Sequence, residues 1–240
     1  MKKLFEKEPI WFAVAWIVIY VLTFSAADGL SETIGVPKLL TVCVGLLLSA
    51  VLLGFIGKNG LKEYFGLRAV QGDWKSFLYF VPLLIISSAS SWSGLALTQP
   101  LHLAALAVAA MCLVGLLEEL IFRGLLFRAM CRDSVKVAIL VSSLTFGVGH
   151  IVNLLMGAPL LATLLQLVYA SAVGFCYTAI VYVGGSIWPC VISHAVVNSL
   201  SVFAPESSVT MDIVTAVAQT VLGIGYGAYI LHRGKKEAQQ

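Results

Sequence analysis

The sequence predicts an all-α fold, a polytopic transmembrane helical bundle of about eight spans with both termini in the cytoplasm. Of its 240 residues, 60% are hydrophobic and 11% are charged, whereas soluble domains carry about 25% charged residues. Long apolar runs recur along the chain, and basic residues lie between them. The runs are much longer than the roughly ten alternating residues of a barrel strand, which excludes a β-barrel. We therefore expect residues 1–240 to form a single membrane domain.

Each expected span contains roughly 20 mainly apolar residues, the length that crosses the hydrocarbon core. The eight segments are approximately 10–27, 38–57, 76–97, 101–122, 135–156, 159–183, 186–204 and 209–231. The helical pattern of the fourth continues past Arg123 and Arg128 into the cytoplasm. A cleaved signal peptide is the alternative for the first, but acidic Glu6 and Glu8 and the length of the apolar run favour a retained helix.

The basic residues predict the orientation through the positive-inside rule. With the amino terminus inside, all but two of the 15 basic residues fall on the cytoplasmic side. Those on that side are Lys2, Lys3, Lys7, Lys58, Lys62, Arg68, Lys75, Arg128, Arg132, Lys136, Arg233, Lys235 and Lys236. The exceptions are Lys38 in an outer loop and Arg123 within a span. An even number of spans agrees with this orientation.

Cysteine usage and charge exclude several other classes of protein. The five cysteines are odd in number and lack CxxC or CxxH spacing, which argues against a disulfide framework and a zinc finger. The net charge is only +3, and its basic residues are scattered, so we expect no nucleic-acid partner. The lipid bilayer is the expected environment.

Three charged residues occupy the fourth span or its edge. An unpaired charge there costs roughly 3 kcal/mol on insertion scales, so each needs compensation. Glu119 and Arg123 are separated by four residues in the favourable acid-before-base order, which predicts an ion pair within the helix. Glu118 points about 100° away from Glu119. It must be protonated, paired with another helix, or directed into a water-filled cavity.

Two further spans each carry a histidine. Phe146 lies one turn before His150, and Asn198 lies one turn after His194. Such polar groups on one helix face can point into a shared cavity, although a lone histidine in a span is often only an interhelical hydrogen bond. Asn153 is a candidate for the same side or for an orienting hydrogen bond. Gly147, Gly149 and Gly174 favour close helix packing over a widened cavity.

Together, a carboxylate, two imidazoles and an amide can activate water and stabilise an oxyanion. The candidate catalytic residues are Glu118, His150, His194 and Asn198. The HExxH, GxGD and GxSG patterns of other membrane proteases are absent from the sequence.

The residues EELIFR at 118–123, FGVGH at 146–150 and HAVVN at 194–198 resemble the EExxxR, FxxxH and HxxxN motifs of the CPBP family, also called Abi or CAAX-protease-like. Each motif is weak alone, but the three occur in the family's order in separate spans. They cover about a third of the chain, and the family-like catalytic core is expected at about 101–204. The resemblance implies an intramembrane peptidase.

The resemblance also implies a role for each residue. Glu118 and His150 would activate the attacking water, while His194 and Asn198 would hold the oxyanion or the substrate carbonyl. Glu119 and Arg123 would support the site, and so would Phe146 and Asn153. The family is usually labelled a metalloprotease, so Glu118, His150 and His194 could ligate Zn²⁺. A glutamate-type mechanism without metal stays open.

The expected substrates are membrane-embedded peptides or proteins. The short chain and its basic start look bacterial, which favours the cytoplasmic membrane and peptide-pheromone maturation, bacteriocin processing or self-immunity over prenylated CAAX substrates. The main alternative is a non-catalytic membrane interaction or immunity protein that regulates a membrane partner. A transporter is a weaker alternative, because no pair of broken apolar segments occupies corresponding halves.

Overall fold

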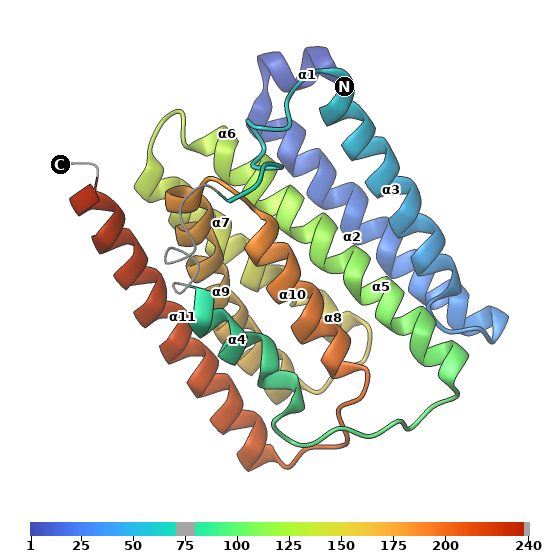
Figure 1. The fold of residues 1–240 in the computed structure, drawn as a ribbon. Coiled ribbons are helices and arrows are strands. Elements are labelled where there is room, and N and C mark those ends of the chain that lie inside the picture. The colour runs from blue at the N-terminus through green and yellow to red at the C-terminus, as the bar shows by residue number, and fades with distance from the viewer. Residues whose placement is uncertain (71–79, 238–240) are drawn as a thin grey trace.

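The computed structural model describes residues 1–70 and 80–237, and within them the chain is helical and contains no strand. Figure 1 shows long helices packed side by side as one bundle. The helices are α1 (Lys2–Lys7), α2 (Pro9–Ile34), α3 (Leu39–Lys58), α4 (Val81–Ser88), η2 (Ala89–Ser91), α5 (Leu101–Glu119), η3 (Leu120–Phe127), α6 (Arg128–Met130), α7 (Val135–Gly149), α8 (Val152–Leu155), α9 (Leu160–Gly184), α10 (Trp188–Ser201) and α11 (Val209–Glu237).

Six helical stretches of the described chain are long and apolar enough to cross a membrane. They are Pro9–Ile34, Leu39–Lys58, Leu101–Met130, Val135–Leu155, Leu160–Gly184 and Val209–Gly234. The helical fold and these six spans confirm the predicted class. The expected continuation of the fourth span past Arg123 and Arg128 is also confirmed, because α5, η3 and α6 follow one another without a break.

The seventh expected span is a shorter helix than the sequence predicts, and the third ends earlier than the sequence predicts. The third contains α4 and η2, which end at Ser91, and the preceding residues 76–79 and Lys75 lie outside the described residues. The seventh is α10, whose 14 residues give a length of about 21 Å at 1.5 Å per residue. Both helices lie within the bundle beside longer neighbours (Figure 1), so neither has to cover the full hydrocarbon thickness alone.

α1 and the carboxyl end of α11 lie at the same end of the bundle (Figure 1). Phe5 contacts the rings of Tyr64 and Phe65 there, and Arg132 bonds the hydroxyl of Tyr64. At the carboxyl end of α11, Gly234 lies against Val183 near the end of α9. We call this the basic end. It gathers basic residues as the positive-inside rule requires of the cytoplasmic side.

Loops with few basic residues form the opposite end. The Asp28–Lys38 ion pair, with 2.7 Å between Oδ2 and Nζ, joins the end of α2 to the start of α3. The amide of Ala96 donates to the carbonyl of Phe203 at 2.7 Å, which connects the loops before α5 and after α10. Lys38, the predicted exception among the basic residues, therefore lies away from the basic end.

Glycines allow the close helix contacts that position the site. A Cβ added to Gly115 of α5 would lie 2.8 Å from the backbone nitrogen of Ala195 in α10. One added to Gly147 of α7 would lie 1.9 Å from the hydroxyl of Ser171 in α9. Small residues permit this approach where lipid supplies no hydrophobic drive for helix association. The predicted packing role of Gly147 is confirmed, whereas Gly149 has open space around its Cβ position.

We predict that Gly115→Ala separates α5 from α10 and destabilises the protein by about 1–3 kcal/mol, the usual cost of overpacking. Gly29→Ala is the matched control, because Gly29 lies in α2 with nothing within 4 Å of its Cβ position. Thermal unfolding in detergent, followed by tryptophan fluorescence, measures both. Equal unfolding temperatures for the two variants would contradict the proposed close contact.

Candidate functional site

The predicted ion pair within the fourth span is present and fully buried. Nη1 of Arg123 donates to Oε1 of Glu119 at 3.0 Å, and both side chains have no exposed surface. Arg123 lies in η3, a π-helical segment whose eight residues are all buried. Segments of π-helix occur frequently at functional sites. The pair confirms the expectation that Glu119 and Arg123 neutralise each other.

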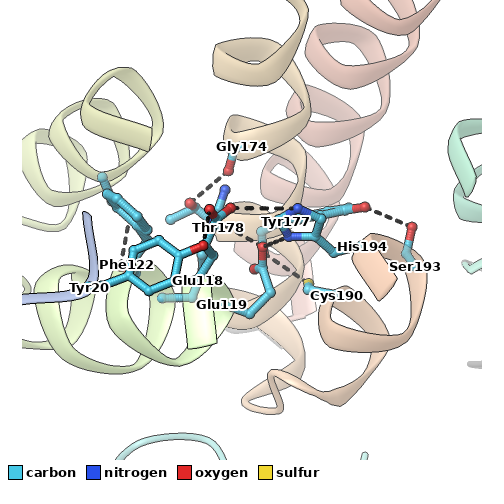
Figure 2. A network of polar contacts seen from close by, with 12 residues as sticks. Tyr20, Glu118, Glu119, Phe122, Gly174, Tyr177, Thr178, Cys190, Ser193 and His194 are labelled. Carbon is cyan, nitrogen blue, oxygen red and sulfur yellow. Dashed lines mark hydrogen bonds and ion pairs between the residues drawn. The ribbon is translucent and has the colours of Figure 1, made fainter. Parts of the chain in front are cut away.

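His194 of α10 lies between the two adjacent glutamates of α5 (Figure 2). Its Nδ1 is 2.9 Å from Oε1 of Glu119, and its Nε2 is 3.6 Å from Oε2 of Glu118. Glu118 is thus paired with another helix, which was one of the three arrangements that its position predicted. We call Glu118, Glu119, Arg123 and His194 the buried charge cluster.

The arrangement of the imidazole constrains the protons of the cluster. When Nδ1 of His194 donates to the Glu119 carboxylate, a neutral ring presents a lone pair at Nε2. That lone pair would face Oε2 of Glu118, which lies 3.6 Å away, so a proton on either atom would relieve the repulsion between them. Arg123 balances Glu119, and such a proton would balance the second pair. The buried charge cluster would then be neutral overall, which would remove most of the cost of placing charges in lipid.

Tyr20 of α2 is a site residue that sequence reasoning missed. Its hydroxyl donates to Oε1 of Glu118 at 2.7 Å, and Figure 2 shows its ring beside the carboxylate. Nothing in the sequence signals this contact, since Tyr20 lies in an ordinary apolar span about 100 residues away and outside the three motifs. The hydroxyl orients Glu118 and satisfies one of its two oxygens.

Phe146 connects the arginine to both histidines. The guanidinium carbon of Arg123 lies 4.2 Å from the centre of the Phe146 ring. The same ring makes T-shaped contacts with His150 and His194, and the distances between ring centroids are 5.5 Å and 5.6 Å. Among the described residues, Nε and Nη2 of Arg123 are buried without a hydrogen-bond partner. The aromatic face therefore supplies part of the compensation that the cation requires.

Gly174 of α9 leaves the space that the arginine occupies. A Cβ at this position would lie 2.8 Å from Nη2 of Arg123 and 3.1 Å from the Phe146 ring. The predicted close packing at Gly174 is confirmed, and its neighbour is the buried charge cluster.

A cavity of about 360 Å³ reaches the cluster, and we call it the central cavity. Its wall includes Tyr20, Glu118, Phe146, His150, Asn153 and Asn198. His150 reaches it from the carboxyl end of α7, and Asn198 from one turn beyond His194. The structure thus brings the predicted site residues to one region, with His194 lining an adjoining cavity of about 160 Å³.

Asn153 lies further along the cavity wall than the other candidates. Its Nδ2 donates to Oε1 of Gln166 at 2.8 Å, which connects α8 to α9. Both roles considered for Asn153, lining the cavity and orienting through a hydrogen bond, apply in this structure.

The metal hypothesis needs three ligands around one point. Among the residues that the structure describes, no three His, Cys, Asp or Glu side chains are arranged to hold a metal ion. With these side-chain positions, Glu118, His150 and His194 do not form such a set, and the requirement for a metal stays a prediction.

Comparison with known proteins adds one family. Residues 100–200 match the family model described as type II CAAX prenyl endopeptidase Rce1-like. This match confirms the resemblance to the CPBP family. The matched segment includes Glu118, His150, His194 and Asn198, but not Tyr20. It supports a CAAX-type intramembrane protease at the level of the family, in a multi-pass membrane protein. No curated protein and no solved structure matches the chain.

We predict that Arg123→Ala destabilises the protein by about 3–5 kcal/mol, because it leaves the Glu119 charge buried without its partner. Lys2→Ala is the control, since it breaks an exposed pair with Glu6 and should cost less than about 1 kcal/mol. Chemical unfolding in mixed micelles gives both values. Similar stabilities of the two variants would show that the buried pair is not needed.

Proposed function

We propose that the chain is an intramembrane endopeptidase that hydrolyses peptide bonds of membrane-associated peptides or proteins with a water activated by Glu118 and His150. The observation that carries the proposal is the placement of Glu118. One of its oxygens accepts from Tyr20, while the other is buried without a hydrogen-bond partner among the described residues and faces His194 beside the central cavity. A carboxylate oxygen held in this way is suited to accept a proton from water.

The hydrolysis balances as a general-base reaction. Glu118, assisted by His150, takes one proton as the water oxygen attacks the carbonyl carbon of the peptide. His194 and Asn198 stabilise the oxyanion with N–H donors from one face of α10. The C–N bond then breaks, and Glu118 returns the proton to the departing amine. The products are a carboxylic acid and an amine.

The remaining cluster residues support this chemistry without touching the substrate. Glu119 holds Nδ1 of His194 at 2.9 Å, which fixes the ring so that Nε2 faces the reacting groups. Arg123 in turn fixes Glu119. Tyr177 donates to the Ser193 hydroxyl at 2.8 Å and so anchors α10 beside the histidine.

The proposed substrates are those expected of a small bacterial membrane peptidase. Peptide-pheromone maturation, bacteriocin processing and self-immunity fit a chain of this kind, and a bacterial cytoplasmic membrane is the proposed location. A candidate peptide encoded beside the gene would be the first substrate to assay.

We predict that Glu118→Gln and His150→Ala each lower the rate of peptide hydrolysis by about 10²–10⁴-fold, the usual contribution of a general acid–base. The matched control is Glu206→Gln, an exposed glutamate in the loop before α11. Mass spectrometry of a candidate peptide after incubation with each purified variant measures cleavage. Full activity in both site variants would require the protease proposal to be abandoned.

Tyr20→Phe tests the contact that lies outside the family match. We expect kcat to fall by about tenfold or more with little change in KM, because a hydrogen bond to a charged group contributes about 1.5–3 kcal/mol. Tyr182→Phe, on an exposed tyrosine, is the control. An unchanged kcat in Tyr20→Phe would show that the hydroxyl does not assist Glu118.

Metal analysis of active purified protein separates the two mechanisms. The glutamate-type mechanism predicts that activity survives in protein with no bound zinc. Stoichiometric zinc that is lost together with activity, and restores it when added back, would instead assign Glu118, His150 and His194 as ligands.

The alternative is a non-catalytic membrane interaction or immunity protein whose cavity binds a partner without cutting it. It predicts that Glu118→Gln preserves the cellular phenotype and partner association at a normal protein level. The protease proposal predicts that the phenotype is lost while the protein level and the association are unchanged.

A further inference from the structure

Apart from Phe122, one turn beyond Glu118, the lining of the central cavity leads from Glu118 toward one end of the bundle. On α2 its lining residues run from Tyr20 to Asp28, and on α5 they run from Glu118 back to Met111. On α7 and the turn that follows, they run from Phe146 to Met156. Since these helices alternate in direction, each run leads toward the opposite end of the bundle, where the Asp28–Lys38 pair also lines the wall.

Packed apolar residues close the route from Glu118 to the basic end. Leu117, Leu120 and Ile121 next to the glutamates have no exposed surface, and Phe127 at the end of η3 has none. Phe5 and Phe65 add a second buried layer at the basic end. Within the described residues, a dry plug therefore separates the buried charge cluster from the side that carries the termini.

The exposed fraction of the lining side chains rises from Glu118 toward the opposite end of the bundle. The Glu118 side chain is 13% exposed, Asp28 is 32% exposed, and Met156 is 54% exposed. The mouth of the central cavity thus lies at the opposite end, which is the non-cytoplasmic side by the positive-inside rule.

Two smaller cavities continue from the central cavity past His194. The 160 Å³ cavity shares His150, Asn198 and Ser201 with the central cavity. A further one of about 300 Å³ shares Ser201 and Gln219 with it and reaches Asp212 at the start of α11. The space beside His150 and Asn198 therefore has two arms, and both lead to the opposite end. An extended chain has room on both sides of a carbonyl held there.

We infer that the site receives its substrate from the non-cytoplasmic side, as an internal stretch of peptide whose two flanks occupy the two arms. That the occupant is a substrate rests on the proposed function, while the direction of access depends on the cavity and on the orientation that the basic residues predict. The expected substrates are then segments of peptides exposed at the outer surface of the membrane. Cytoplasmic chain ends, including prenylated ones, are not expected to be substrates.

Thiol labelling tests the direction of access without requiring catalysis. The parent carries serine in place of Cys43, Cys112 and Cys131, and keeps the buried Cys176 and Cys190. Val114→Cys places a thiol in the central cavity one turn from Glu118. Val196→Cys is the matched control at a similar depth, because Gly115 packs on Ala195 and Val196 is exposed on the outside of the bundle. Lys62→Cys and Glu206→Cys report the two sides of the membrane.

A membrane-impermeant maleimide is applied to right-side-out and inside-out vesicles. We expect Val114→Cys to be labelled only from the side that labels Glu206→Cys, with Lys62→Cys labelled from the other, cytoplasmic, side and Val196→Cys unlabelled. Met156→Cys at the mouth repeats the test if Val114→Cys does not accumulate. Labelling of the cavity thiol from the Lys62→Cys side, or orientation controls that place Glu206 in the cytoplasm, overturns the inference and leaves the protease proposal standing. Hydrolysis that survives Glu118→Gln would overturn the protease proposal and leave the direction of access standing.

Discussion

The structure depends on one interaction, the contact of His194 with both glutamates of the fourth span. Without it, Glu118 would carry an uncompensated charge inside the membrane, at a cost of roughly 3 kcal/mol. Nε2 of His194 faces Oε2 of Glu118 at 3.6 Å, and Arg123 neutralises Glu119 at 3.0 Å. Because the partners lie on α5 and α10, the contact that compensates the charge also joins the two helices. Gly115 permits that association by allowing α10 to approach within backbone distance.

The same interaction links stability to chemistry. In the proposed reaction a proton moves from water to Glu118, and this carboxylate lines the central cavity. Glu119 and Arg123 have no exposed surface, so their charges interact more strongly than in water. Tyr20 and Phe146 fix the orientation of the groups, which gives the site its geometry before any substrate arrives.

Much of this arrangement could be predicted from local patterns. Hydropathy gives the helices, the basic residues give the orientation, and the four-residue spacing gives the Glu119–Arg123 pair. Contacts between distant helices could not be predicted, because spacing within one helix carries no information on its neighbours. The pairing of His194 with both glutamates and the contribution of Tyr20 are of this kind. The early end of the third expected span and the shortness of α10 were also missed, since apolar loop residues extend the hydropathy signal beyond the helix ends.

The central claim is that Glu118 and His194 act as one unit across two helices. A double-mutant cycle in peptide hydrolysis tests it most directly, using Glu118→Gln, His194→Gln and the combined variant, each with its unfolding temperature measured. We expect the combined variant to be no slower than the slower single variant, because Glu118 and the imidazole that faces it act only with both in place. Multiplicative losses, in which the combined variant is slower by the product of the two single effects, would contradict the account.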